Sequence, residues 1–160
     1  MALRTIRTLG DPVLEKKCRE VKEMTPRIKE LIQDMYETMH NGEGVGLAAP
    51  QVGILKRIAV VDVTGEDPIT LINPVIVEEE GEQTGDEGCL SLPGKAGQVT
   101  RPMRVVVEAL NENMEKVRLE GEELLARAFC HEIDHLDGHM YIEKVEGEIH
   151  DVHYDEEEEE

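Results

Sequence analysis

The hydrophobic positions of the chain repeat with helical spacing in two segments. Between residues 25 and 41, apolar side chains recur every three or four residues, with Thr25 placed as an N-cap and Pro26 in the first turn. A second helix is predicted from about Glu122 to Leu136 and ends near Gly138. We therefore expect one helix near each end of the chain.

Between these helices, short apolar segments bounded by turn residues predict strands. Asn73-Pro74 separates two of them, and Asn111-Glu112-Asn113 predicts a hairpin turn. The expected strands cover residues 58–63, 69–72, 75–80, 98–101, 105–110 and 117–120. Strands grouped between two helices indicate an α+β domain with a mainly antiparallel sheet.

The composition is that of a chain that can form one domain. It has 160 residues and 39% apolar residues, which is enough for a core of its own. No apolar segment approaches the roughly 20 residues needed to span a bilayer. Residues 1–6 also lack the apolar stretch of a secretory signal. We therefore expect a cytoplasmic protein that does not associate with membranes.

The charge of the chain bears on its expected partners and on the bounds of the domain. The net charge is −19, and such a surface repels polyanions, so no direct nucleic-acid binding is expected. The sequence ends in an acidic run, residues 155–160, which is typical of a solvated segment. We expect residues 1–145 to form the domain and residues 146–160 to be an acidic C-terminal tail.

The second helix carries two histidines with metal-binding spacing. His131 and His135 are four residues apart, about 40° around the helix and roughly 6 Å along it, so both imidazoles can reach one ion. Glu132 can flank that ion without ligating it, which is the general-base position of hydrolases with an HExxH motif. Apolar neighbours indicate that the helix is largely buried, and buried polar groups need a compensating partner. A metal site is therefore favoured over a chance match on a surface helix.

The residues after this motif offer poor candidates for a third ligand. One protease family adds a third histidine downstream, but that position is Tyr141 here, and His139 is out of step. A thermolysin-like enzyme takes a glutamate from a later helix, and too few residues follow His135 for such a second domain. The third ligand is therefore expected upstream.

The chain has three cysteines, and an odd, sparse set argues against a disulfide framework. Cys18 is interpreted as core filler. Cys130 adjoins the first histidine, so it projects about 100° away around the helix. Cys89 follows a glycine in a segment rich in Gly and Pro. Cys89 is therefore the thiolate most able to complete a Cys/His/His site.

Three segments resemble the peptide deformylase family. Residues 44–51 resemble its GxGLAAPQ element, residues 87–91 its EGCLS element and residues 131–138 its HExxH element. Their order and spacing make the resemblance specific, and it extends from about Leu3 to Glu143. It implies mainly antiparallel sheets packed around a central HExxH helix, with a further N-terminal helix. It also makes residues 1–145 the catalytic domain.

The resemblance implies a hydrolase that removes the N-formyl group from the N-terminal methionine of newly synthesised polypeptides and releases formate. Cys89, His131 and His135 would hold one divalent metal ion, with a fourth position open to water. Such an ion lowers the pKa of its water and supplies hydroxide near neutral pH. Glu132 would take the water proton and return it to the leaving amine.

Four further residues receive roles from the same resemblance. The side-chain amide of Gln51 and the backbone N–H of Leu90 would stabilise the oxyanion together with the metal, at about 3 kcal/mol for each donor. Glu87 and Arg101 match a charged pair that braces the EGCLS loop.

The substrate would bind beside these groups. Two glycines would let its backbone approach a strand edge, and a third would relieve crowding beside the cysteine ligand. The methionine pocket would have His131 at its floor. The predicted substrate-binding residues are Gly44, Val45, Gly46, Gly88, Leu124 and Ala128.

The identity of the metal is open. A thiolate with two imidazoles suits zinc, iron, nickel or cobalt. The resemblance implies Fe²⁺ in the cell, with Zn²⁺, Ni²⁺ or Co²⁺ in purified protein. The chain departs from the family at Cys130, where glutamine is usual, and in its acidic end, where some members have a basic helix that docks on the ribosome. We expect proximity to the ribosome without that docking helix.

Two other interpretations of the motif are weighed against this one. A small metalloprotease could use the same helix, and it would cleave unformylated peptides as well. A protein with a structural metal would need a closed site of four ligands. Three good ligands and a poised glutamate favour catalysis.

Overall fold

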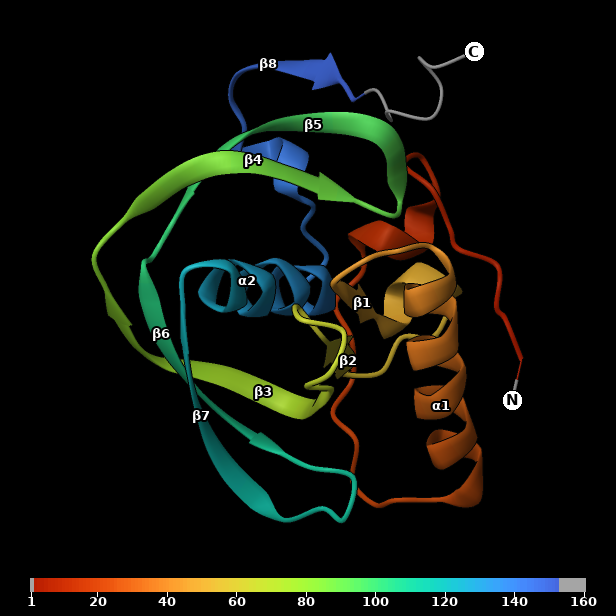
Figure 1. Ribbon diagram of the computed structural model, residues 1–160. Coiled ribbons are helices and arrows are strands. Elements are labelled where there is room, and N and C mark those ends of the chain that lie inside the picture. The colour runs from red at the N-terminus through yellow and green to blue at the C-terminus, as the bar shows by residue number, and fades with distance from the viewer. Residues whose placement is uncertain (1, 153–160) are drawn as a thin grey trace.

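The computed structural model describes residues 2–152, and within them two antiparallel sheets enclose a central helix (Figure 1). The larger sheet has the order β1-β2-β3-β6-β7, formed by Gly46–Ala48, Ile58–Val61, Ile69–Glu80, Arg104–Leu110 and Lys116–Glu122. The smaller sheet has the order β4-β5-β8, formed by Gln83–Cys89, Leu92–Arg101 and Glu146–Asp151. The helices are α1, Pro26–Asn41, and α2, Leu124–Leu136, and three short 3₁₀ turns span Pro12–Glu15, Ala49–Val52 and Tyr141–Lys144. The predicted α+β class is confirmed.

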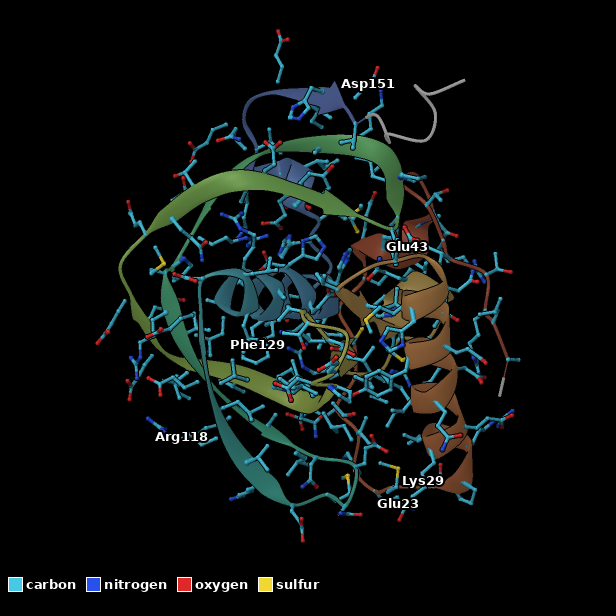
Figure 2. The ribbon with its side chains drawn as sticks, viewed as in Figure 1. Glu23, Lys29, Glu43, Arg118, Phe129 and Asp151 are labelled. Atoms are coloured by element: carbon cyan, nitrogen blue, oxygen red, sulfur yellow. The ribbon has the colours of Figure 1, made fainter. Side chains whose placement is uncertain are left out.

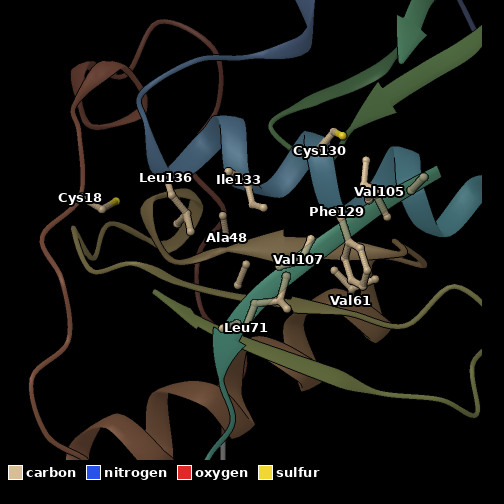
Figure 3. Close-up of a cluster of buried hydrophobic side chains, with 14 residues drawn as sticks. Cys18, Ala48, Val61, Leu71, Val105, Val107, Phe129, Cys130, Ile133 and Leu136 are labelled. Atoms are coloured by element: carbon tan, nitrogen blue, oxygen red, sulfur yellow. The ribbon is translucent and has the colours of Figure 1, made fainter. Parts of the chain in front are cut away.

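Helix α2 lies between the two sheets, and its apolar side packs on the larger one (Figure 1). Phe129, Ile133 and Leu136 point toward valine and leucine side chains of the strands (Figure 3). The periodic apolar positions of the sequence thus become a buried stripe. The opposite side of α2 faces β4 and β5, and it carries the polar motif.

Helix α1 forms where the sequence predicts it. The Thr25 side chain accepts a hydrogen bond from the Ile28 N–H at 3.2 Å, and Pro26 occupies the first turn. Its apolar side packs against β1 and β2 to form a second core cluster. Because α1 covers these strands, the start of the larger sheet is held in place next to α2.

The prediction of two separate strands around Asn73-Pro74 was wrong, because β3 continues through both residues with a bulge between Ile72 and Val75. Asn73 adopts a left-handed backbone with φ of 52°. Its side chain donates to the Val21 carbonyl and accepts from the Val21 N–H, both at 2.9 Å. A bulge tolerates proline, which donates no ladder hydrogen bond.

The structure contains strands that the sequence did not predict, and one strand that is longer than predicted. The hairpin turn at residues 111–113 is confirmed, since Leu110 pairs with Lys116 across it. The segment after Gly44, where the sequence analysis expected no strand, contains β1, and β5 begins at Leu92 rather than at residue 98. Strands β4 and β8 have few apolar residues, so the pattern did not predict them.

The C-terminal part of the described chain belongs to the smaller sheet. Residues 146–151 form β8, which pairs with β5 through Lys95–Asp151 and Ala96–His150. The sequence analysis expected no strand there, and residues 153–160 of the expected tail lie outside the described residues. Within residues 2–152, no helix is both long enough and apolar enough to cross a bilayer.

Candidate metal centre and active site

The three predicted ligands come together at the junction of α2 with the smaller sheet. Cys89 is the last residue of β4, where a bulge turns the chain toward β5, and His131 and His135 lie on α2. Their ligand atoms all lie within 4.8 Å of one another, and Cys89 Sγ is 3.3 Å from His135 Nε2. The structure therefore brings the sulfur of Cys89 to two imidazoles of α2, although Cys89 lies 46 positions from His135 in the sequence.

His131 is oriented by a buried carboxylate. Its Nδ1–H donates to Glu87 Oε2 at 2.5 Å, which leaves Nε2 free to ligate. Burial raises the pKa of Glu87, but hydrogen bonds from His131 and Arg101 outweigh this and hold it well below the ordinary value. The carboxylate is thus charged and fixed behind the first histidine ligand.

Glu87 is itself held by two buried arginines. Arg101 donates to it through Nε at 3.1 Å and Nη2 at 2.6 Å, so the predicted pair is formed. Arg101 Nη1 also donates to Asp134 Oδ2 at 2.8 Å. Arg127 adds a further hydrogen bond to Glu87 Oε1 at 2.8 Å. The sequence analysis missed Arg127 and Asp134.

A sequence signal for both residues existed. Arg127 lies one helical turn before the first histidine, and Asp134 lies three residues after it, so both share its side of the helix. Charged residues on the side of a helix that carries buried ligands are expected to pair with one another or with a neighbouring strand.

Glu132 is buried beside β1. Its carboxylate packs against Gly46, where a Cβ atom would lie 2.4 Å from Glu132 Oε2. Glycine at position 46 therefore makes room for Glu132. Burial raises the pKa of Glu132 to about 7, and the His131 charge opposes this. Its Oε1 has no hydrogen-bond partner among the described residues.

The other two motif glycines also make room for side chains or backbone. A Cβ at Gly44 would lie 2.8 Å from Leu90 Cδ1, and one at Gly88 would lie 3.1 Å from the Lys95 carbonyl oxygen. The close approach at Gly44 thus involves the chain's own Leu90. Whether a substrate backbone also uses this space stays a prediction.

Gln51 links the GxGLAAPQ segment to the cysteine. The Ala48 N–H donates to Gln51 Oε1 at 2.9 Å, which orients the amide. Gln51 Nε2 then donates to Ser91 Oγ at 3.0 Å and to Cys89 Sγ at 3.4 Å. The Ser91 N–H also donates to Cys89 Sγ at 3.4 Å. These donors stabilise negative charge on the sulfur.

A cleft of about 480 Å³ opens over this group. Its lining is mostly apolar or glycine, and it includes Cys89, His131 and Glu132. It includes all the predicted substrate-binding residues: Gly44, Val45, Gly46, Gly88, Leu124 and Ala128. The cleft also contains Arg127 and, from the segment after β8, Val152.

The electrostatics of the site suit a cation. Burial lowers the pKa of His131, but the negative charges of Glu132, Cys89 and Glu87 outweigh this and raise it well above its ordinary value, so these groups favour a positive charge at this ring, a proton or a metal ion in its place. Burial and the His131 charge lower the pKa of His135 well below its ordinary value, so that ring is neutral and able to ligate. The Cys/His/His donor set therefore fits a transition-metal ion.

Comparison with known proteins agrees with this geometry. The family model described as polypeptide deformylase matches residues 3–149. The chain belongs to the polypeptide deformylase family. Members of this family are hydrolases that remove the N-formyl group from newly synthesised polypeptides at a single catalytic metal. The predicted family, enzyme class and reaction are thereby confirmed.

Similarity to individual family members extends over nearly the whole chain. A peptide deformylase of Agathobacter rectalis is 68% identical over 97% of this chain and 98% of its own. The crystal structure of the peptide deformylase from Thermotoga maritima matches with a TM-score of 0.87 at 42% identity, over 91% of this chain and 99% of its own. The structure from Thermus thermophilus has a TM-score of 0.87 at 45% identity, over 90% and 86% of the two chains.

Proposed function

We propose that Cys89, His131 and His135 hold the single metal ion of this deformylase and that Glu132 moves the proton. The observation that carries the proposal is that the three ligand atoms lie within 4.8 Å of one another, and that two of the three residues, Cys89 and His131, line the cleft. Glu132 also lines the cleft, with one carboxylate oxygen free of hydrogen bonds among the described residues. When bound, the ion supplies a Lewis acid and lowers the pKa of water.

Glu132 has the placement of a general acid–base group. Burial raises its pKa to about 7, near the value at which such a group can both accept and donate a proton. Its carboxylate packs against Gly46, and both residues line the cleft. It would accept the proton of the attacking water and return it to the departing amine.

Two donors would stabilise the oxyanion of the reaction. Leu90 lines the cleft next to Cys89, and its backbone N–H would be one of these donors. The Gln51 amide is held by the Ala48 N–H, so its Nε2 points toward Cys89 Sγ. Donors fixed before the reaction cost no reorganisation as charge develops.

The strands beside the cleft favour an extended peptide as substrate. β1 is the first strand of the larger sheet and β4 the first of the smaller sheet, so each presents an edge without a partner strand among residues 2–152. Both edges border the cleft. A nascent chain can pair with such an edge, while its methionine side chain enters the apolar part lined by Val45, Leu124 and Ala128.

The remaining proposals concern the identity of the metal ion, the location of the enzyme in the cell and its partners. The donor set suits Fe²⁺, Zn²⁺, Ni²⁺ or Co²⁺, and the family resemblance favours Fe²⁺ in the cell. Because the substrate is a newly synthesised polypeptide, we expect the enzyme to act in the cytoplasm and close to ribosomes. The acidic charge balance argues against direct binding of nucleic acid.

The proposed site is tested by metal analysis together with an assay of formate release. Wild-type protein purified without oxygen should release formate from a formyl-methionyl tripeptide and leave the unformylated peptide intact. Cys89→Ala should lose stoichiometric metal and activity, whereas Cys18→Ala, a buried cysteine outside the site, should keep both. Full metal occupancy in Cys89→Ala would show that the ligand assignment is wrong. Cleavage of the unformylated peptide would favour a metalloprotease.

A further inference from the structure

Residues 42–45 form a loop between the end of α1 and the start of β1, and all four line the cleft. This rim loop contains two glycines, and Glu43 has a φ of 60°, in the left-handed region that a residue with a side chain rarely adopts unless its surroundings hold it there. Figure 2 shows Glu43 at the end of α1 that lies nearer the smaller sheet, opposite Lys29. A loop of this kind keeps a single position only if both of its ends are anchored.

Asp62 anchors the end of the rim loop that leads into β1. It follows β2 directly, and its N–H donates to the Val45 carbonyl oxygen at 2.8 Å. Its carboxylate accepts from the N–H groups of Gly65 and Asp67 at 2.8 and 3.1 Å. Burial raises the pKa of Asp62, but hydrogen bonds from Asp67 and His40 outweigh this and lower it. The carboxylate is therefore charged and can only accept hydrogen bonds.

His40 connects this anchor to α1. It lies in the last turn of the helix, and its ring Nε2 donates to Asp62 Oδ2 at 3.0 Å. Tyr36, one turn earlier, stacks on the His40 ring with the ring centroids 6.3 Å apart. The same turn of α1 holds the other end of the rim loop, because the Glu43 N–H donates to the His40 carbonyl oxygen at 3.0 Å. The side-chain pair of His40 and Asp62 thus ties the two ends of the loop together.

The rim loop also contacts the smaller sheet. A Cβ atom at Gly44 would lie 2.8 Å from Leu90 Cδ1, and one at Gly42 would lie 3.2 Å from Leu90 Cδ2. Leu90 belongs to the turn between β4 and β5, whereas the rim loop leads into β1 of the larger sheet. The position of the loop is therefore linked to the relative position of the two strand edges that border the cleft.

We propose that His40 and Asp62 are positioning residues of the deformylation site, which hold the rim loop so that the edges of β1 and β4 stand where an extended peptide can pair with them. Neither side chain lines the cleft, so both act through the loop rather than by touching the substrate. This inference rests on the proposed function, because it assumes that formylated peptides lie along these edges.

The proposal predicts an effect that depends on the length of the peptide. A formylated tripeptide extends along the strand edges, whereas formyl-methionine amide ends after its first residue. A displaced rim loop should therefore weaken the tripeptide and spare the short substrate. A pair that only stabilised the fold would behave differently. Its loss would lower the folded fraction, which reduces the apparent kcat equally for both substrates and leaves each KM unchanged.

Two substitutions at His40 separate these roles. His40→Ala removes the donor to Asp62, and His40→Gln replaces it with an amide N–H. The His40 side chain is 49% exposed, so little packing is lost in either variant. If His40→Ala does not fold, His40→Phe takes its place, because it keeps a ring to stack on Tyr36 without the donor. The matched control is His139→Ala, which removes a similarly exposed histidine 3.0 Å from Glu143 and outside the cleft lining.

The first readout is amide hydrogen exchange of the zinc-loaded protein, which needs no activity. In His40→Ala, the amides of Glu43 and Asp62 should exchange about five- to tenfold faster, the size expected when one hydrogen bond is lost. The Arg127 amide, which donates to the Glu123 carbonyl oxygen at the start of α2, should not change. His40→Gln and His139→Ala should match wild type. Wild-type exchange of the Glu43 and Asp62 amides in His40→Ala would overturn the positioning role.

The second readout compares the kinetics of the two substrates. His40→Ala should raise the KM of a formyl-methionyl tripeptide about tenfold and change the KM of formyl-methionine amide by less than about twofold. His40→Gln should restore the tripeptide KM, and His139→Ala should leave both constants at wild-type values. An equal loss of kcat for both substrates with unchanged KM would overturn the proposal, because a structural role gives that result. Failure of the wild-type protein itself to release formate would instead overturn the proposed function.

Discussion

The two sides of α2 are built on opposite principles. The side against the larger sheet is apolar, and Phe129 and Ile133 pack there among valine and leucine side chains. The side against the smaller sheet carries two metal-ligand candidates, and its charged neighbours Arg127 and Asp134 pair with groups on β4 and β5. Both sides are buried, yet only the first is stabilised mainly by burial of apolar area.

The two sides of α2 should therefore respond differently to substitution. On the apolar side, truncating a side chain removes buried apolar area but leaves no charged group unpaired, so losses of stability should be moderate. On the polar side, one carboxylate has three charged or polar partners, so a single change leaves several buried groups unpaired.

The largest effect is expected for Glu132→Gln. The amide cannot take up and return a proton, so deformylation should fall about 10²- to 10⁴-fold. Metal content should stay near wild type, because Glu132 is not a ligand. Formate release and metal analysis on the same preparation test this, with the exposed Glu37→Gln on α1 as the control. A variant with near wild-type turnover would remove Glu132 from the mechanism.

Glu87→Gln should combine a loss of stability with a loss of metal affinity. The substitution leaves Arg101 and Arg127 without their shared charge partner, and breaking a buried ion pair in this way costs about 3–5 kcal/mol. Urea unfolding of the apoprotein measures the first effect, and cobalt titration the second. If stability and affinity both match wild type, the polar side is not coupled as described.

On the apolar side, Ile133→Val should affect stability alone. It deletes one methylene from a buried side chain, which costs about 0.5–1.5 kcal/mol. The metal content and the kcat of the folded enzyme should remain at the wild-type values. Ile133 adjoins Glu132 in sequence, but it packs on the apolar side of α2. A fall in kcat beyond the error of the assay would therefore contradict the separation of the two sides.

The smallest effect is expected at an ion pair far from α2. Asp34 accepts from the Ala2 N–H at 2.7 Å and from Arg4 Nε at 2.9 Å. Burial raises the pKa of Asp34, but these two donors outweigh it and the pKa is lowered. The stabilisation is therefore complete above the unfolded pKa, about 4, and is lost as the pH falls below it.

Asp34→Asn should accordingly be less stable than wild type at pH 7, and the difference should shrink toward acid pH. Urea unfolding at pH 7 and at an acid pH below about 4 measures this difference, with the exposed Glu30→Gln on the same helix as a control. Equal differences at both pH values would show that the Asp34 charge makes no contribution. Activity should not change, because the hydrogen bonds of Asp34 are made to Ala2 and Arg4 and not to residues of the cleft.

Much of the fold followed from local patterns in the sequence. Helix α1 was predicted from a cap and a periodic apolar stripe, and both are encoded within a few residues. β2, β6 and β7 contain consecutive or alternating apolar residues that are recognisable one strand at a time. β4 and β8 are rich in polar residues and glycine, so their pairing with β5 could not be read from their own sequence.

The sequence by itself determined the pair of histidines and the glutamate beside them, because a helix fixes the relation of residues four apart. It also determined the family, through three motifs in order. Only the tertiary structure decided that Cys89 meets those histidines and that Glu87 is shared by Arg101, Arg127 and His131. The physical reason is that these contacts join α2 to a different sheet, and the partner of a buried charge is set by packing across elements rather than by spacing along the chain.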